Sequence, residues 1–278
     1  MTDSLRDTIA RWVDLEGSTR PAALMRLGLG LIVWIRFGDT LAPFEAAHLV
    51  LGVHGAIVLL FATLVVIGLL TRVALAGLAL SLAFGYFVLG GGYGVAGWYH
   101  HHVYLLVSAA FLLALTPCGR SYSVDRLLAL RAGHAAEERG PLWGQALIGL
   151  QLSAIYFWAA VDKTDLAFLS GERLEQTFVW VYSGRVLEAW LIWQPFLALA
   201  SVGVVVLEYV LAVAIHVRRW QPVALPVGFG LHAAFYLFLP VNTYSVTMML
   251  LYLALLDPQA VHRFIDRMQG HAPAVHRP

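Results

Sequence analysis

The chain has 278 residues, of which 60% are hydrophobic and only 13% are charged, and its formal net charge at pH 7 is +1. Soluble domains average about 45–50% apolar and about 25% charged residues, so this composition indicates an integral membrane protein. The small net charge excludes a broad basic surface, and we expect no nucleic-acid partner. The single cysteine, Cys118, excludes an internal disulfide bond.

The predicted elements are helices throughout. Residues 1–20 mix charged and apolar residues at helical spacing, which predicts an amphipathic cytoplasmic segment at the membrane surface. Stretches long enough to cross a bilayer, about 20 mainly apolar residues each, follow it. They predict about eight transmembrane helices, near residues 21–37, 53–71, 73–90, 102–117, 142–161, 196–217, 222–240 and 242–257. The predicted fold is an all-α polytopic membrane helix bundle, with a transmembrane domain over residues 21–257 and a cytoplasmic C-terminal tail over residues 258–278.

The distribution of basic residues predicts the orientation. With the N-terminus in the cytoplasm, thirteen arginines lie in the cytoplasmic segments. The segments on the external side of the membrane contain only Lys163, Arg173 and Arg185. Positive residues concentrate on the cytoplasmic side, so we expect a multi-pass protein of the cell membrane with both termini in the cytoplasm. The three exceptions share one aromatic-rich external segment, residues 162–195, which we expect to form a lid or re-entrant element.

Lys163 is the only lysine among 18 lysines and arginines. A guanidinium stays protonated at any accessible pH, whereas a partly desolvated lysine ammonium can lose its proton and act as a base. The use of lysine at this position alone therefore makes Lys163 a candidate catalytic residue.

Three consecutive histidines, His100, His101 and His102, precede the fourth predicted span. Successive helical residues point about 100° apart, so the three cannot ligate one metal ion, and we expect no metal site. Two interpretations remain open: one histidine faces the inside of the bundle, or all of them anchor the helix end in the membrane interface.

Glu208 and His232 are polar residues inside two adjacent antiparallel spans. Counting about 1.5 Å per residue from their shared turn places both near the middle of the membrane, where they can meet. A lone buried carboxylate is unfavourable there, so the pair either joins the helices or forms the floor of a polar cavity. Arg26, Arg36 and Gln151 are further polar groups that must face inward.

We expect a structural role, and not a catalytic one, for the segment Pro117-Cys-Gly-Arg-Ser-Tyr-Ser-Val-Asp125. Proline and glycine end one helix, and Ser123 is placed to cap the next one.

Several runs carry a family resemblance: "HVYLLVSAAFLLALTPCGRSYSVD", "IYFWAAVDKTDLAFLSG", "LEYVLAVAI" and "GLHAAFYLF". They resemble the HTTM (horizontally transferred transmembrane) domain family, which includes the vitamin K-dependent γ-glutamyl carboxylase. The resemblance is carried most specifically by His-x-Tyr-Leu at a helix start, Pro-x-Gly-Arg-x-x-Ser-x-Asp, and Tyr-Phe…Lys-x-Asp…Gly at a helix end. It covers nearly the whole chain.

The resemblance implies that Lys163 deprotonates a reduced vitamin K, or a menaquinol-like quinone, and that His102 shares its site. It thus implies a quinol-coupled carboxylase-like or oxidoreductase enzyme, and a secreted peptide or small molecule as substrate alongside membrane lipid. Small family members also occur beside secreted peptide toxins, so a non-enzymatic partner in the maturation or export of such a peptide is the alternative. Candidate catalytic residues are Lys163 and His102, and candidate substrate- or cofactor-binding residues are Tyr104, Tyr156, His232, Glu208 and His101.

Overall fold

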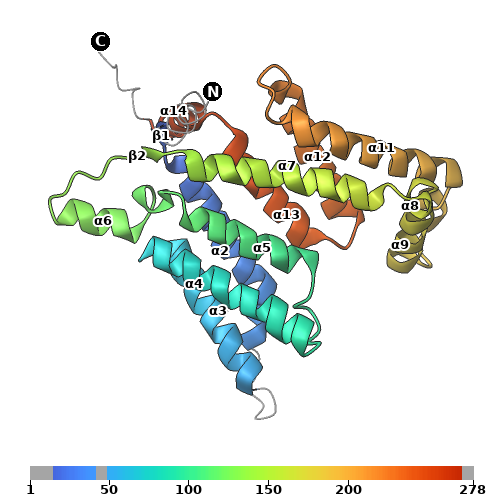
Figure 1. Ribbon diagram of the computed structural model, residues 1–278, viewed down its shortest axis with the longest axis horizontal. Coiled ribbons are helices and arrows are strands. Elements are labelled where there is room, and N and C mark those ends of the chain that lie inside the picture. The colour runs from blue at the N-terminus through green and yellow to red at the C-terminus, as the bar shows by residue number, and fades with distance from the viewer. Residues whose placement is uncertain (1–14, 42–48, 271–278) are drawn as a thin grey trace, which may run out of the picture. The chain divides into compact units, whose positions relative to one another are not determined.

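Helices dominate the fold because a segment inside a bilayer must satisfy its own backbone hydrogen bonds. The computed structural model describes residues 15–41 and 49–270. Its helices are α2 (Arg20–Phe37), α3 (Leu49–Ile67), α4 (Thr71–Phe84), α5 (His101–Ala114), α6 (Val124–Arg131), α7 (Trp143–Lys163), α8 (Leu166–Leu169), α9 (Glu172–Tyr182), α10 (Glu188–Leu191), α11 (Gln194–Ala214), α12 (Gln221–Phe238), α13 (Asn242–Leu251) and α14 (Pro258–Met268) (Figure 1). A π-helix, Gly85–Gly92, continues α4, and short 3-10 helices lie at Gly38–Leu41, Cys118–Arg120 and Tyr252–Leu255. The predicted all-α class is confirmed.

Each predicted span has a helical counterpart, displaced by a few residues at most ends. Within residues 15–41 and 49–270, five helices are long and apolar enough to cross a membrane: Leu49–Ile67, Thr71–Gly92, Trp143–Lys163, Gln194–Ala214 and Gln221–Phe238. The pair Asn242–Leu255 and Pro258–Met268, bent by 101°, makes a sixth if it counts as one span. The helix α2 contains three arginines and α5 has only 14 residues. A polytopic membrane bundle is therefore supported, and the number eight stays a prediction.

The chain divides into two compact units, and the division falls within α7 and α13. Unit 1 comprises residues 1–148 and 250–278, and unit 2 comprises residues 149–249.

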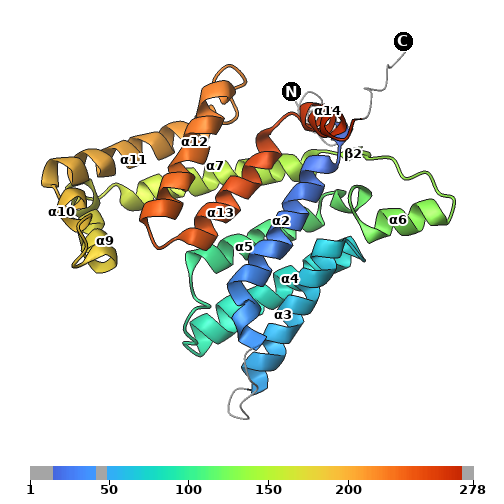
Figure 2. The same cartoon turned by 180° about the vertical axis from the view of Figure 1, so that it is seen from behind.

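In unit 1, α2 packs against α3, α5 and α14, and α4 packs against both α3 and α5. Figures 1 and 2 show α2, α3, α4 and α5 side by side from opposite directions. Their contact is made by apolar residues that are fully buried, such as Leu29 and Val33 on α2, Leu78 on α4 and Leu106 on α5.

A two-stranded antiparallel sheet joins the start of α2 to the segment before α7. Strand β1 (Glu16–Ser18) pairs with β2 (Arg139–Pro141), with Gly17 opposite Gly140. The sequence did not indicate these strands. Of the amphipathic segment predicted over residues 1–20, residues 1–14 lie outside the described part of the chain, and residues 16–18 form a strand instead.

The predicted C-terminal tail contains a packed helix. Helix α14 contacts α2 and β1. Arg20 pairs with Asp266 at 2.6 Å and with Glu138 at 2.7 Å, and the Ser18 hydroxyl hydrogen-bonds His262 Nδ1 at 2.9 Å. Residues 258–268 are thus part of unit 1, and residues 271–278 lie outside the described residues.

The buried Arg26 joins three segments of unit 1. Its side chain is fully buried on α2, and its guanidinium donates to the carbonyls of Val65 at 2.6 Å, Val66 at 3.2 Å and Tyr122 at 2.6 Å. The last carbonyls of a helix have no partner within that helix. Arg26 therefore satisfies the end of α3 and holds the loop before α6 against it.

The turn after α3 is shaped to accept this arginine. Gly68 has φ +70°, a region that favours glycine, and a Cβ atom at this position would overlap Arg26 Nη1. The backbone N–H of Asp125 donates to the Gly68 carbonyl at 3.0 Å.

The predicted architectural role of residues 117–125 agrees with their contacts. The Asp125 carboxylate accepts hydrogen bonds from the backbone N–H groups of Leu70 and Thr71 and from the Thr71 hydroxyl, at 2.7–2.8 Å, and so caps the start of α4. The Ser123 hydroxyl accepts from Arg126 N at 3.0 Å and caps α6, as predicted. This segment therefore fastens the α3–α4 turn together with Arg26.

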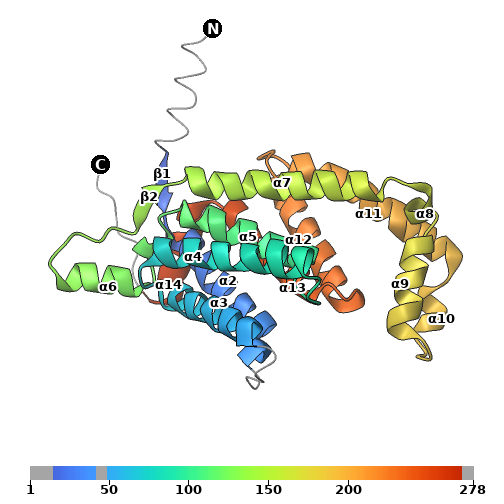
Figure 3. The same cartoon turned by 60° about the horizontal axis from the view of Figure 1, so that its bottom comes forward.

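In unit 2, the aromatic-rich segment 162–195 folds into the short helices α8, α9 and α10, which Figure 3 shows together. Phe178 and Tyr182 of α9 form a buried apolar cluster with Leu191 and with Leu197 of α11. The Tyr182 hydroxyl also donates to the carbonyl of Phe238 at the end of α12, at 3.1 Å. The segment is thus anchored on α11 and α12, and its external placement stays a prediction.

Replacing Arg26 with methionine should destabilise unit 1, because several buried carbonyls would lose their donor. Each unsatisfied group of this kind costs about 1–3 kcal/mol. Unfolding can be followed through Cys118, whose thiol is fully buried and is the only one in the chain. We expect thiol labelling on heating to begin at a lower temperature in Arg26→Met, and at the wild-type temperature in Arg131→Met, a change at an exposed arginine.

Cys118 should also be inert in the folded protein. Burial raises the pKa of the Cys118 thiol, so the reactive thiolate is depleted at neutral pH, and the thiol lacks exposed surface. A membrane-permeant maleimide should label the native chain far more slowly than the denatured chain. Equal labelling rates would contradict the packing described for residues 117–125.

Candidate functional site

Lys163 is the last residue of α7, and its side chain turns back along that helix. Its ammonium donates to the carbonyl of Ala159, one turn earlier, and to both carboxylate oxygens of Glu208, each at 3.1 Å. Helical side chains lean towards the N-terminus, and a cation at a helix C-terminus is stabilised by the helix dipole. The three contacts match the three N–H donors of an ammonium, so this geometry describes a charged lysine.

Glu208 lies on the buried face of α11, in line with Ser201, Val205 and Leu211. Its side chain is only 4% exposed, whereas that of Lys163 is 24% exposed. The carboxylate is therefore the enclosed partner of the ion pair, and the ammonium is the partner that can be reached. Desolvation disfavours both charges, and the attraction between them offsets this only because the contact is close and the hydrogen bonds are made.

A second polar pair lies in the same unit. The Tyr156 hydroxyl and His232 Nε2 are 2.8 Å apart, and both residues are about 1% exposed. Tyr156 precedes Lys163 by seven residues and so shares its face of α7. His232 lies on the buried face of α12 with Ala224 and Gly228.

Aromatic rings enclose this second pair. The His232 ring lies 5.7 Å from the ring of Phe235 and 5.8 Å from that of Tyr244, measured between centroids. Beside Lys163, the Thr164 hydroxyl is 3.1 Å from the hydroxyl of Tyr209. Unit 2 thus holds a polar cluster, defined here as Tyr156, Lys163, Glu208 and His232, with apolar surroundings that strengthen its electrostatic interactions.

The partners within the polar cluster differ from those expected. We expected Glu208 and His232 to meet, but the Glu208 carboxylate pairs with Lys163 and the imidazole of His232 bonds to Tyr156. The depth count compared only Glu208 and His232, and it missed the Lys163–Glu208 pair because the lysine side chain is long and leans back along its helix.

The motif Lys-x-Asp…Gly also has a structural explanation. Asp165 accepts from Phe168 N at 3.0 Å and caps α8, while its carboxylate pairs with Arg173 at 3.0 Å. Gly171 has φ +89°, and a Cβ atom there would lie 2.6 Å from the Cβ of Leu197. Asp165 and Gly171 therefore set the path of the chain directly after Lys163, where α8 and α9 pack on α11.

The other candidate residues, His102, His101 and Tyr104, belong to unit 1. The Arg36 guanidinium donates to His102 Nε2 at 3.3 Å and to the Gly97 carbonyl at 3.2 Å. Because arginine has no acceptor, Nε2 must present its lone pair, which leaves the proton of a neutral ring on Nδ1. Arg36, noted in the sequence only as an inward-facing group, is thus the partner of His102.

The side chains of His100 and His101 are more exposed to solvent than that of His102. The rings of His100 and His102 stack with centroids 5.2 Å apart, His101 is exposed, and Tyr104 is 54% exposed. Across residues 15–41 and 49–270, no group of three or more His, Cys, Asp or Glu side chains is placed to hold a metal ion. Since Lys163 and His102 lie in different units, their convergence on one cavity stays a prediction.

The two partners of the Lys163–Glu208 ion pair should respond differently to substitution. Lys163→Met leaves an enclosed carboxylate without its cation, and removal of one partner of a buried pair costs about 3–5 kcal/mol. Glu208→Leu leaves a lysine that already reaches solvent, so we expect a smaller loss. Equilibrium unfolding in detergent, followed by tryptophan fluorescence, measures both.

The double variant Lys163→Met/Glu208→Leu should lose less stability than the two single variants added together. The exposed pair Arg173–Asp165 provides the matched control, because pairs of this kind contribute about 0–1 kcal/mol. Strict additivity at Lys163 and Glu208 would show that the ion pair is absent in the folded protein.

The comparison with known families agrees with the resemblance noted in the sequence. The HTTM domain profile matches residues 35–259, which includes all of unit 2 and most of unit 1. No solved structure matches the chain at a significant level. Because the profile covers most of the sequence, the chain belongs to the HTTM domain family.

Proposed function

We propose that this HTTM-domain membrane protein is an enzyme in which Lys163 acts as a general base on a lipid-soluble quinol, in carboxylase-like or oxidoreductase chemistry. The observation that carries the proposal is the contact of Lys163 with Glu208. A lysine base needs a neutral amine, and an ammonium with all three protons donated has no lone pair to offer. Glu208 supplies the missing acceptor at hydrogen-bond distance.

The proton transfers balance without any further group. When the ammonium of Lys163 passes one proton to the Glu208 carboxylate, a neutral amine and a carboxylic acid result. The amine then takes a hydroxyl proton from the substrate and becomes an ammonium again, so the net transfer is from substrate hydroxyl to Glu208. Lys163 relays the proton, and its restored charge lies beside the new oxyanion.

The residues present suit a reduced vitamin K or a related menaquinol-like quinone. Such a group would supply the redox chemistry, and its ring would need an apolar environment with one basic contact. Lys163 is the exposed member of its ion pair, so a ring hydroxyl can reach its ammonium. Tyr156 and His232 add a buried hydroxyl–imidazole pair in the same unit.

Lys163→Arg separates the catalytic role from the structural one. An arginine retains the positive charge opposite Glu208, so the fold should persist, but it cannot release a proton near neutral pH. General acid–base catalysis contributes about 10²–10⁴-fold, and we expect consumption of reduced menaquinone by the purified protein to fall by that factor. Arg173→Gln, at the exposed pair in the same unit, should leave turnover unchanged. Retained turnover in a folded Lys163→Arg variant would exclude the base role.

A second candidate function is a non-enzymatic role in the maturation or export of a secreted peptide. It is favoured by the exposed tryptophans of the segment after Lys163: Trp180 on α9 is 75% exposed and Trp190 on α10 is 76% exposed. This role predicts that Trp180→Ser and Trp190→Ser reduce secretion of a co-expressed peptide, while Lys163→Arg has no effect on it. The enzymatic proposal predicts the opposite pattern.

A further inference from the structure

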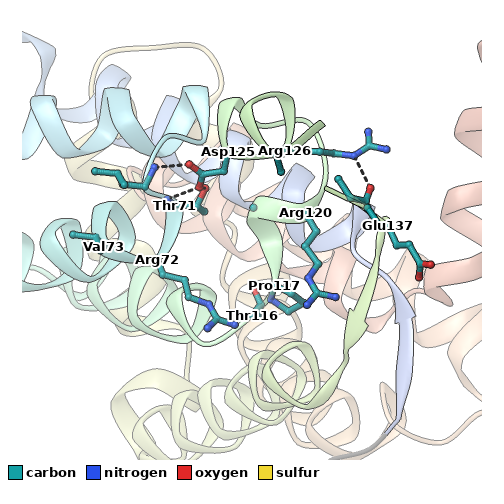
Figure 4. Close-up of a pocket in the computed structure, with 14 residues that line it drawn as sticks. Thr71, Arg72, Val73, Thr116, Pro117, Arg120, Asp125, Arg126 and Glu137 are labelled. Carbon is teal, nitrogen blue, oxygen red and sulfur yellow. Dashed lines mark hydrogen bonds between the residues drawn. The ribbon is translucent and has the colours of Figure 1, made fainter. Parts of the chain in front are cut away.

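Unit 1 contains a cavity of about 780 Å³ among the loops that join α3 to α4, α5 to α6 and α6 to β2 (Figure 4). The charged residues of its lining are Arg72, Arg120, Asp125, Arg126 and Glu137. None of them belongs to the polar cluster of unit 2, so an inference from this cavity does not depend on the proposed enzymatic function.

The cavity lies at the level where lipid headgroups are expected. The apolar stretch of α3 ends at Ile67 and that of α4 begins at Thr71, so the turn between them marks one end of two candidate spans. Beside the charged residues, Leu70 is 61% exposed and Val73 is 65% exposed. Polar and apolar groups thus meet at one opening, as they do in a phospholipid.

The adjoining helix α6 extends the apolar surface. It has no buried residue, and Leu127, Leu128 and Leu130 are 45–50% exposed. A short helix with exposed leucines and with arginines at 126 and 131 is suited to lie in the membrane interface. Acyl chains next to the cavity would therefore contact protein as well as lipid.

The charges of the cavity are not all engaged within the protein. Asp125 is used to cap α4, and Arg126 donates to the Ala136 carbonyl at 3.2 Å and pairs with Glu138 at 3.1 Å. Arg120 donates through Nη1 alone, to the Arg139 carbonyl at 2.6 Å. Among the described residues, the side chain of Arg72 makes no hydrogen bond or ion pair.

Arg72 and Arg120 extend towards the same part of the cavity, beside Thr116 and Pro117 (Figure 4). Arg72 lies in the first turn of α4, where the helix dipole disfavours a cation. A bound anion between the two guanidinium groups would compensate their mutual repulsion. Arginine is well matched to phosphate, because its planar fork donates two parallel hydrogen bonds.

We propose that this cavity binds the headgroup of an anionic phospholipid, with the phosphate between Arg72 and Arg120 and the acyl chains over Leu70, Val73 and α6. Glu137 lines the same cavity, and its carboxylate can accept a hydrogen bond from a hydroxyl group but not from a phosphate. A headgroup with free hydroxyl groups therefore fits better than a second phosphate. Phosphatidylglycerol has both features and is the probe of choice.

Native mass spectrometry of the full chain, titrated with phosphatidylglycerol or phosphatidylcholine, tests the proposal. We expect tighter binding of phosphatidylglycerol, and an affinity lower by on the order of tenfold in Arg72→Gln, which removes a charged donor. Arg120→Gln should have a similar effect. Arg131→Gln removes an exposed arginine from α6 outside the cavity lining, and it should bind like the wild type.

The Arg72 side chain makes no hydrogen bond or ion pair among the described residues, so its replacement should leave the fold intact, and Cys118 labelling on heating verifies this. Equal affinities of the Arg72→Gln and Arg131→Gln variants for phosphatidylglycerol would overturn the proposal, as would equal binding of the two lipids. Competition by inorganic phosphate or glycerol phosphate at the same concentration as the lipid would assign the cavity to a soluble anion instead.

Discussion

The packing of unit 1 depends on one buried cation. Arg26 sits inside an apolar core, and its charge is tolerated only because carbonyl dipoles from two other segments point at it. The same contacts close the end of α3 and fix the loop before α6, from which Asp125 caps α4. Removing this side chain would loosen the α3–α4 and α5–α6 connections together.

A similar rule governs unit 2, where the buried charge is negative. Glu208 is enclosed on α11, and the single lysine of the chain reaches it from the end of α7. A permanently charged guanidinium could also balance the carboxylate. A lysine differs from it in being able to release a proton near neutral pH, which the proposed function requires.

Much of the fold could be predicted because hydropathy reports directly on helices in a bilayer. The apolar runs gave helices close to α3, α7, α11 and α12, and the cap at Ser123 followed from local side-chain chemistry. The strands β1 and β2 could not be predicted, since three-residue strands pair residues far apart in sequence and leave no periodic pattern. The helical content of residues 166–191 was equally hidden, because those helices depend on packing against α11.

The sequence indicated single residues of the polar cluster but not the contacts between them. Tyr156 and Lys163 share a helical face, which seven-residue spacing is enough to show, and Glu208 stands out as a carboxylate within an apolar run. Their partners depend on how α7, α11 and α12 lie against one another and on the direction in which each side chain leans. No rule of spacing within one helix contains that information, and so Glu208 was assigned to His232 and not to Lys163.

The connection from Lys163 to α8 has a mechanical consequence. Only Thr164 separates the lysine from Asp165, whose carboxylate starts α8, and Gly171 leaves no spare room between the following turn and α11. With so little slack, the packing of α8 and α9 on α11 restricts where the backbone of Lys163 can lie. The same packing therefore helps to set the distance between the Lys163 ammonium and the Glu208 carboxylate.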